Sequence, residues 1–285
     1  MADQAESLRK AFEEYNNCNK NDTKIITIAS GKGGVGKSVL AVNIGLVLAE
    51  RGKKVTLMDA DFGLANINVI LGVLPKYNLY HVFKGEKKLS EILIEVDDNF
   101  SIIAGASGFY QLANLNSNQR KKILTQLEDL NHNDYLIIDA GAGISKNVLN
   151  MITSAQQAII VTTPEPTAIT DAYGIIKSIV SLNTNDVKLS LVINRVKSIV
   201  EAKQISNRIT NIVDQFLGAE INYLGFIFDD PVVYKSVKEQ DPFVRSYPHS
   251  KASSCIFNLV DSITNRKTIS QEGNIKNFFK KIFKF

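Results

Sequence analysis

The most chemically specific feature of this 285-residue sequence is a glycine-rich loop at residues 31–38, Gly-Lys-Gly-Gly-Val-Gly-Lys-Ser. It fits the pattern G-x-x-x-x-G-K-[ST] and lies between a strand-like apolar run and a segment with helical spacing. Glycines let backbone amides surround phosphate oxygens, and the following helix adds its positive N-terminus. We therefore predict a nucleotide site in which Lys37 bridges the β- and γ-phosphates and Ser38 ligates Mg²⁺. The expected nucleotide contacts of the loop are Gly33, Gly34, Val35, Gly36, Lys37, Ser38 and Val39.

Three aspartates follow strand-like runs and could act on the bound phosphates. Asp59 and Asp61 are two residues apart where a run ends, so their side chains share one direction and both can face the phosphates. Asp139 ends a later run and precedes the small residues 140–143. A buried carboxylate at such a position can orient the water ligands of Mg²⁺. This pattern predicts a magnesium site beside the phosphates, with Ser38 as a ligand and Asp139 as a partner of the water ligands.

The elements that position these groups follow from short apolar runs rich in β-branched residues, which are mostly continuous rather than alternating. Such runs are typical of strands buried on both faces of a parallel sheet, and helix-like segments separate them. We predict an α/β fold with a doubly wound, mostly parallel sheet flanked by helices and ligands at the carboxyl ends of the strands. The expected strands are Ile25–Ala29, Val55–Met58, Phe100–Ala104, Tyr135–Ile138, Ala158–Thr162, Leu189–Ile193 and Tyr223–Phe228. The expected helices are Ser38–Arg51, Asn118–Leu130, Thr170–Leu182 and Glu201–Leu217.

Composition places this fold in one domain with two tails. Residues 1–22 are expected to form an N-terminal segment and linker, 23–263 the domain, and 264–285 a linker and C-terminal helix. With 45% hydrophobic and 22% charged residues, the chain has an ordinary globular composition. It has no signal-peptide-like start, no apolar stretch of 18 residues, and two cysteines without metal-site spacing. A cytoplasmic protein is therefore expected.

The net charge of +4 is concentrated at the C-terminus, where four lysines occur without an acidic residue. A domain that binds nucleic acid more often carries its basic excess on its folded body. The charge distribution therefore argues against nucleic acid as a partner.

A second lysine inside the loop, Lys32, gives it the form Lys-Gly-Gly-Val-Gly-Lys-Ser. In this feature the sequence resembles the deviant Walker A family of MinD and ParA. The resemblance implies a P-loop ATPase that forms a homodimer around ATP, in which Lys32 reaches the nucleotide of the other subunit. It also implies that Asp59 supports the magnesium shell and that Asp61 orients the attacking water. The catalytic residues would be Lys32, Lys37 and Asp61, and hydrolysis should be slow without a stimulating partner.

A base-binding segment is implied by the same resemblance. Asn194 and Arg195 follow a strand-like run, and the family's asparagine at this position reads adenine. An amide offers both a donor and an acceptor, which discriminates adenine from guanine. Pro231 and Val232 match the other wall of the family's base pocket.

The C-terminal tail has the pattern of an amphipathic helix. Its apolar residues are spaced at i, i+3, i+4, i+7 and i+8, and its lysines fall on the opposite face. We predict a helix that lies in an anionic membrane surface, so that the protein binds reversibly to the inner face of the cell membrane. The alternative is a terminal helix docked on its own domain. The expected membrane contacts are Ile275, Phe278, Phe279, Lys280, Lys281, Ile282 and Phe283.

The N-terminal segment carries the pattern D-Q-A-x-x-L-R, formed by Asp3, Gln4, Ala5, Leu8 and Arg9. It is too short for a stable isolated helix but could fold onto a partner. Together with the loop motifs and the basic tail, it resembles the FlhG (YlxH/FleN) branch of flagellar number regulators. The resemblance implies that this segment stimulates the GTPase FlhF and that the protein contacts basal-body (C-ring) proteins. The alternative is an extension without a partner.

Two other functions share the nucleotide motifs. A MinD-type ATPase that positions the division site would have the same loop and tail, but Ala142 replaces its usual proline and the N-terminal pattern argues against it. A ParA-type DNA partition ATPase would have no use for an apolar tail. Iron–sulfur ATPases of this fold need two bridging cysteines beside the nucleotide loops, where neither Cys18 nor Cys255 occurs.

Overall fold

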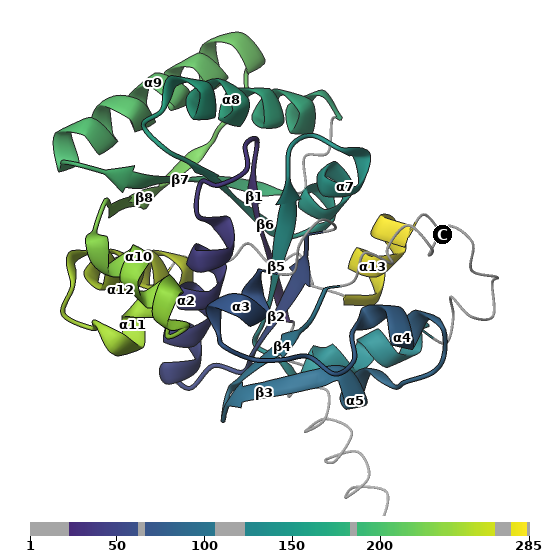
Figure 1. Ribbon diagram of the computed structural model, residues 1–285. Helices are drawn as coiled ribbons and strands as arrows, with labels where there is room; N and C mark the ends of the chain where they lie inside the picture. Colours follow the sequence, from purple (N-terminus) through teal and green to yellow (C-terminus); the bar gives the residue numbers. More distant parts are fainter. Residues whose placement is uncertain (1–22, 62–65, 106–122, 183–186, 266–274, 284–285) are drawn as a thin grey trace, which may run out of the picture.

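A computed structural model describes residues 23–61, 66–105, 123–182, 187–265 and 275–283. Its centre is an eight-stranded sheet (Figure 1) made of β1 Lys24–Ser30, β2 Val55–Ala60, β3 Leu93–Asp97, β4 Phe100–Ile103, β5 Tyr135–Ala142, β6 Gln157–Thr162, β7 Lys188–Val196 and β8 Asn222–Phe228. The strand order is β3-β4-β2-β5-β1-β6-β7-β8. Among the strands in the described residues only β3 and β4 pair antiparallel, so the predicted doubly wound, mostly parallel sheet is confirmed.

Each of the seven apolar runs forms a strand, and the central ones are buried along nearly their whole length. The strand β3 was missed. Its side chains are only partly buried or exposed, because it lies at the edge of the sheet and pairs with a single neighbour, β4. An edge strand of this kind lacks the continuous apolar run that identifies the other strands.

The helices that pack around the sheet are α2 Lys37–Glu50, α3 Ile67–Ile70, α4 Leu79–Phe83, α5 Leu89–Ile92, the 3₁₀ helix η2 Glu128–His132, α7 Lys146–Ser154, α8 Pro166–Ser181, α9 Ile199–Leu217, α10 Pro231–Glu239, α11 Phe243–Ser246, α12 Lys251–Thr264 and α13 Ile275–Phe283. The predicted helices near α2, α8 and α9 are confirmed. The one predicted at Asn118–Leu130 lies partly outside the described residues, and within them a helical turn at 123–127 runs into η2.

Two hydrophobic cores form, one on each face of the sheet. The first packs α7, α8, α9 and α13 against one face, and the second packs α2, α11 and α12 against the other. Helix α2 is buried on nearly all sides because it lies between the sheet and α12. Figure 1 shows these helices on both sides of the sheet, with α13 beside α7.

The topology brings the candidate site to one edge. Strand β1 lies between β5 and β6, and the order reverses around it, so the connections that leave β1, β2 and β5 start at neighbouring carboxyl ends. Doubly wound sheets bind ligands at such a position. None of the helices in the described part of the chain is long and apolar enough to span a membrane.

Candidate nucleotide site

The phosphate loop connects the end of β1 to the start of α2, and two close backbone contacts fix its shape. Gly36 has a φ of 94°, and a Cβ at this position would lie 2.4 Å from the Asn194 amide nitrogen. At Gly31, a Cβ would lie 2.1 Å from the carbonyl oxygen of Asp171 in α8. Glycine is therefore required at both positions, and the loop is packed between α8 and the end of β7.

The N-terminus of α2 is formed by Lys37 and Ser38, both of which are largely buried. The Lys37 ammonium lies 3.8 Å from Oδ1 of Asp139, in the carboxyl-terminal half of β5. Asp139 is completely buried, and neither of its oxygens has a hydrogen-bond partner among the described residues. Buried polar atoms are usually satisfied. An unsatisfied carboxylate beside a helix N-terminus therefore indicates a site that a ligand completes.

The neighbouring carboxylate Asp59 is paired in register with Asp139 on the adjacent strand. Burial, together with the negative charge of Asp139, raises the pKa of Asp59 to about 7, although backbone hydrogen bonds act in the opposite direction. Burial likewise raises the pKa of Asp139 to about 6, although Lys37 and Ser38 act in the opposite direction. Two close buried carboxylates resist joint ionisation, and a divalent cation would relieve this.

The donor set fits Mg²⁺, which prefers oxygen ligands and keeps several waters. Ser38 offers a hydroxyl oxygen, and Asp59 and Asp139 offer carboxylates for water ligands. Within the described residues no group of three or more His, Cys, Asp or Glu side chains could hold a metal directly. A magnesium ion at this position would therefore depend on the phosphates of the nucleotide for part of its coordination.

The segment after β2 is organised by Asp59. Its carboxylate accepts backbone hydrogen bonds from Asp61 at 3.1 Å and from Asn66 at 3.1 Å. The Asp61 carboxylate lies close to Gly141, because a Cβ on that glycine would be 3.6 Å from its Oδ1. The structure thus brings Asp61 to the carboxyl end of β5, beside the residue two positions after Asp139. Its role toward an attacking water remains a prediction.

Asn194, which was predicted to read adenine, contacts the phosphate loop. Its amide nitrogen donates to the Val35 carbonyl at 2.8 Å, and its oxygen accepts from the backbone N–H of Arg195 at 2.9 Å. Arg195 adopts a left-handed conformation with a φ of 60°. Since one amide hydrogen and one lone pair remain, Asn194 can tie the loop to β7 and still face a base. Sequence reasoning did not foresee the link to Val35.

The other predicted wall of the base pocket begins α10. Asp230 caps this helix by accepting from the backbone N–H of Val232 at 3.1 Å, and Pro231 is its first residue. Val232 is partly buried against the second core. Whether Pro231 and Val232 contact a base remains a prediction.

The signature lysine, Lys32, has contacts that sequence reasoning missed. Its ammonium forms an ion pair with Glu165 at 2.7 Å and donates to the Thr167 hydroxyl at 3.0 Å. Glu165 and Thr167 lie at the start of α8. Both partners lie in the polar stretch Thr163-Pro164-Glu165-Pro166-Thr167, for which no contact with Lys32 was predicted.

The predicted membrane helix is folded onto the domain. Ile275, Phe278 and Phe279 of α13 are buried in the first core, with α13 packed on α7 and η2. Lys276 forms an ion pair with Glu128 of η2, and Lys280 and Lys281 are exposed. The docked alternative thus describes this structure, and membrane contact remains a prediction. The predicted partner residues Asp3, Gln4, Ala5, Leu8 and Arg9 lie outside the described residues, as does the side chain of Phe283.

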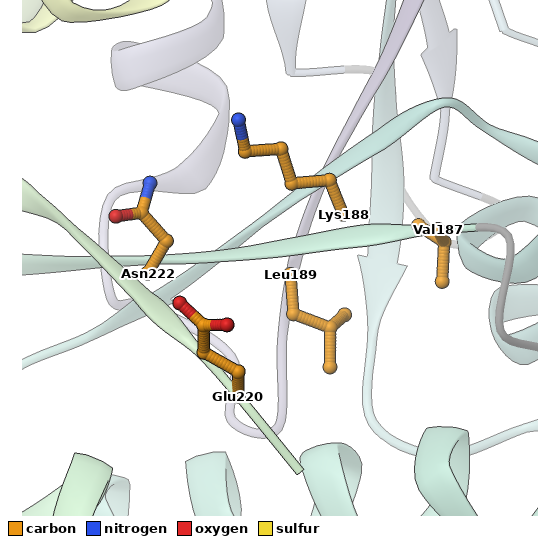
Figure 2. Close-up of a pocket in the computed structure, with 5 residues that line it drawn as sticks. All are labelled: Val187, Lys188, Leu189, Glu220 and Asn222. Carbon is orange, nitrogen blue, oxygen red and sulfur yellow. The ribbon is translucent and has the colours of Figure 1, made fainter. Parts of the chain in front are cut away.

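A separate cavity of about 360 Å³ lies where β7 and β8 begin, at the amino end of the strands (Figure 2). Figure 2 shows Lys188 and Asn222 pointing to one side of the sheet and Leu189 to the other. Because the phosphate loop leaves the carboxyl end of β1, this cavity is not part of the nucleotide site.

Comparison with known proteins agrees with this geometry. Residues 21–264 match a family model described as ParA, NUBPL iron-transfer P-loop NTPase. The chain belongs to the MinD/ParA family of P-loop ATPases. Within this family it is 36% identical to the flagellum site-determining protein YlxH of Helicobacter pylori, over 94% of this chain and 92% of that protein. It is 35% identical to the antiactivator FleN of Pseudomonas aeruginosa, over 81% of this chain and 82% of that protein. The resemblance to the FlhG (YlxH/FleN) branch is thus confirmed.

Solved MinD structures share the fold. The MinC:MinD cell division protein complex of Aquifex aeolicus matches with a TM-score of 0.68 and 28% identity, over 87% of this chain and 99% of that chain. A MinD of Pyrococcus horikoshii complexed with Mg-ADP matches with a TM-score of 0.66 and 25% identity, over 85% of this chain and 96% of that chain. The MinD/ParA chain described here is therefore an ATPase of this fold.

The iron-transfer description of the family model does not extend to the cysteines of this member. Cys255, on α12, is the single cysteine among the described residues, and Cys18 lies outside them. Burial raises the pKa of the Cys255 thiol, which disfavours the thiolate that metals bind.

Proposed function

We propose that this MinD/ParA member is an ATP-dependent dimerising switch that associates with the inner membrane surface and regulates the number or placement of flagella. The observation that carries the proposal is the link from the phosphate site, along the chain to α7 and through packing to the docked helix α13. Asp139 leads through residues 140–145 into α7, and α7 packs against α13. The relatives YlxH and FleN support the flagellar output.

The loop after Asp139 is tied to both ends of this connection. The backbone N–H of Gly143 donates to the Ser30 carbonyl at 2.9 Å, directly before the phosphate loop. Ser145 caps α7 by accepting from the Val148 N–H at 3.4 Å. In addition, Thr27 of β1 donates its hydroxyl hydrogen to the Met151 carbonyl at 3.2 Å. A phosphate that displaces this loop would therefore move α7, and with it the surface that holds α13.

The carboxyl edge of the sheet also carries apolar side chains suited to a dimer interface. Ile144, Ile199 and Val200 are 58%, 52% and 63% exposed, on the loop after β5 and the first turn of α9. Exposed apolar side chains at a shared edge of the sheet are suited to an interaction surface. We propose that two copies close over two ATP molecules here, with Lys32 reaching the nucleotide of the partner subunit and Asp61 orienting water.

Release of α13 would convert dimerisation into membrane binding. The helix carries three apolar side chains that are buried in the domain and three lysines. Each lysine near an anionic surface contributes roughly 1 kcal/mol, and two linked helices bind far more tightly than one. The ATP-bound dimer should therefore reside at the membrane and the monomer in the cytoplasm. Bound Mg²⁺ would supply charge stabilisation at the phosphates.

The partners of the switch are proposed from the same branch of the family. The N-terminal pattern at residues 3–9 would stimulate the GTPase FlhF, and the domain would contact C-ring proteins of the basal body.

Two measurements test the proposal. Co-sedimentation of the full chain with anionic vesicles should rise with ATP and Mg²⁺ and stay low with ADP. A peptide of residues 1–20 should accelerate GTP hydrolysis by an FlhF-type GTPase, and Leu8→Ala with Arg9→Ala should abolish the effect. Vesicle binding without stimulation would indicate a MinD-type membrane switch with another client. ATP-dependent DNA binding by a chain that lacks α13 would indicate a ParA-type motor.

A further inference from the structure

A cluster of lysines and tyrosines lies on and beside α4, away from the nucleotide site. The Lys84 ammonium lies 4.4 Å from the centre of the Tyr80 ring. Lys87 and Lys76 place their ammonium groups 4.4 and 5.5 Å from the centre of the Tyr77 ring. Such distances are those of cation–π contacts. We call this cluster the α4 surface, and its members are Lys76, Tyr77, Tyr80, His81, Lys84 and Lys87.

The rings of the α4 surface are held in place. Tyr77 and Tyr80 pack against the first core, and the His81 ring meets them edge-on with centroids 5.2 and 6.0 Å away. Lys76 and Lys84 contact these rings and still remain exposed. Long side chains that are already ordered lose less entropy when a partner binds. The α4 surface is therefore prepared to present its ammonium groups.

Positive charge gathers at the α4 surface and on α13. Residues 76–91 contain four lysines and two glutamates, and residues 275–283 contain three lysines and no acidic residue. Since the whole chain carries +4, the rest of it has a net charge of −1. The two glutamates, Glu86 and Glu91, lie beside Lys84 and Lys87 and offset only half of the charge. The excess suits an anionic partner.

The α4 surface adjoins the place where α13 is docked. Helix α4 packs on α5, and the backbone N–H of Leu89 in α5 donates to Oε1 of Gln126 at 2.8 Å. Two residues later, Glu128 pairs with Lys276 of α13. All these elements contribute to the first core, and Figure 1 shows α4 and α5 near α13. A partner that receives the released α13 would therefore also meet the α4 surface.

We propose that the α4 surface is a second contact with the anionic membrane, which acts beside α13. The inference rests on the membrane association in the proposed function. Tyrosine rings are amphipathic and gather at membrane interfaces. Each lysine near an anionic surface strengthens binding by a factor of about five. Unlike the apolar face of α13, the lysines of the α4 surface are accessible in the docked form, so they can meet the membrane before α13 is released.

The test measures co-sedimentation of the full-length protein with vesicles of phosphatidylcholine and phosphatidylglycerol, with Mg²⁺ and either ATP or ADP. Lys76→Ala with Lys84→Ala removes two exposed lysines from the α4 surface. Lys235→Ala with Lys251→Ala is the matched control, because these lysines also lie over aromatic rings but on α10 and α12, on the opposite face of the sheet. Thermal unfolding and ATP affinity check that both variants fold.

We expect Lys76→Ala with Lys84→Ala to weaken vesicle binding about 5- to 25-fold with either nucleotide, and the control to leave it unchanged. The loss should shrink in high salt and vanish on phosphatidylcholine alone. Equal binding by the two variants would overturn the inference and leave ATP-dependent membrane binding intact.

Two further outcomes separate the inference from the proposed function. If ATP does not raise vesicle binding of the wild type above that with ADP, the proposed switch fails, whereas a loss confined to Lys76→Ala with Lys84→Ala would still support the α4 surface. If this variant binds vesicles normally but has lost affinity for a DNA duplex that the wild type binds, the α4 surface serves nucleic acid and the inference is overturned.

Discussion

Two regions of the molecule differ in what stabilises them: the nucleotide edge, which is the site at the carboxyl ends of β1, β2 and β5, and the α13 docking surface, which is formed by α7 and η2. At the nucleotide edge, Asp59 and Asp139 are buried charges with raised pKa values, and Asp139 has no hydrogen-bond partner in the described structure. At the docking surface, Ile275, Phe278 and Phe279 are buried among other apolar side chains. The first region is unfavourable until a ligand completes it, whereas the second is favourable as it stands.

This difference indicates how nucleotide binding at the first region could favour release of α13 at the second. Buried, unsatisfied charge costs stability, and a bound nucleotide with Mg²⁺ recovers that cost. Apolar burial of α13 stabilises the closed form and must be given up when the helix leaves. If α7 couples the two regions, the free energy of nucleotide binding can offset the apolar burial that is lost when α13 leaves the domain.

The largest effect is expected for Lys37→Ala, which removes the buried cation of the nucleotide edge. Loss of one partner from a buried charge contact costs about 2–5 kcal/mol, so ATP affinity should fall about 30-fold or more. Isothermal titration calorimetry measures this. Lys53→Ala is the control, because Lys53 forms an exposed ion pair with Asp134 away from the loop. Retained affinity in Lys37→Ala would contradict the site.

Asp139→Asn should stabilise the nucleotide-free chain while abolishing Mg²⁺-dependent hydrolysis. The folded carboxyl has a pKa of about 6 against a usual 3.8, so wild-type stability falls as pH rises between these values. Above about pH 6 the full cost is present, about 1–3 kcal/mol, and asparagine avoids it.

Thermal unfolding in EDTA from pH 4 to pH 8 checks this prediction. The gain of Asp139→Asn over wild type should grow with pH and level off above about pH 6. Asp98→Asn, at an exposed position, should show no such trend. A loss of stability in Asp139→Asn at pH 8 would mean that the contact with Lys37 outweighs burial.

Asn194→Ala should have an intermediate effect, because one amide both supports the loop and faces the proposed base. Loss of its hydrogen bond to the Val35 carbonyl alone costs about 1 kcal/mol, or about fivefold in ATP affinity, and loss of the proposed base contact should bring the total to about tenfold. The preference for ATP over GTP, measured by competition with a fluorescent nucleotide, should fall as well. An unchanged preference would restrict Asn194 to supporting the loop.

The smallest effect is expected at the docking surface, for Glu128→Lys. The substitution replaces an ion pair with Lys276 by a repulsion, which should weaken docking by about 1 kcal/mol. Co-sedimentation of the ATP-free protein with anionic vesicles should rise about fivefold. Glu91→Lys on α5 adds the same charge at another exposed ion pair and controls for general attraction. Equal binding by the two variants would argue against release of α13.

Most of the fold and the phosphate site could be predicted from local sequence. The loop at 31–38 follows a buried strand, the aspartates at 59 and 139 lie in the carboxyl-terminal halves of two others, and parallel strands bring their carboxyl ends to one edge. The apolar spacing of 275–283 likewise defined a helix with one apolar face, which is what the structure contains. These features depend on short-range periodicity and on glycine stereochemistry, which neighbouring residues alone determine.

Other features were decided only by tertiary contacts. Edge strand β3 depends on its pairing with β4, and the apolar face of α13 is buried because α7 and η2 provide a surface that matches it. Lys32 contacts a glutamate 133 residues away, and Asn194 contacts a carbonyl 159 residues away. Spacing predicts which residues share a strand end or a helix face. Which distant partner a side chain meets depends on the packed sheet, because only the folded chain brings such partners within hydrogen-bonding distance.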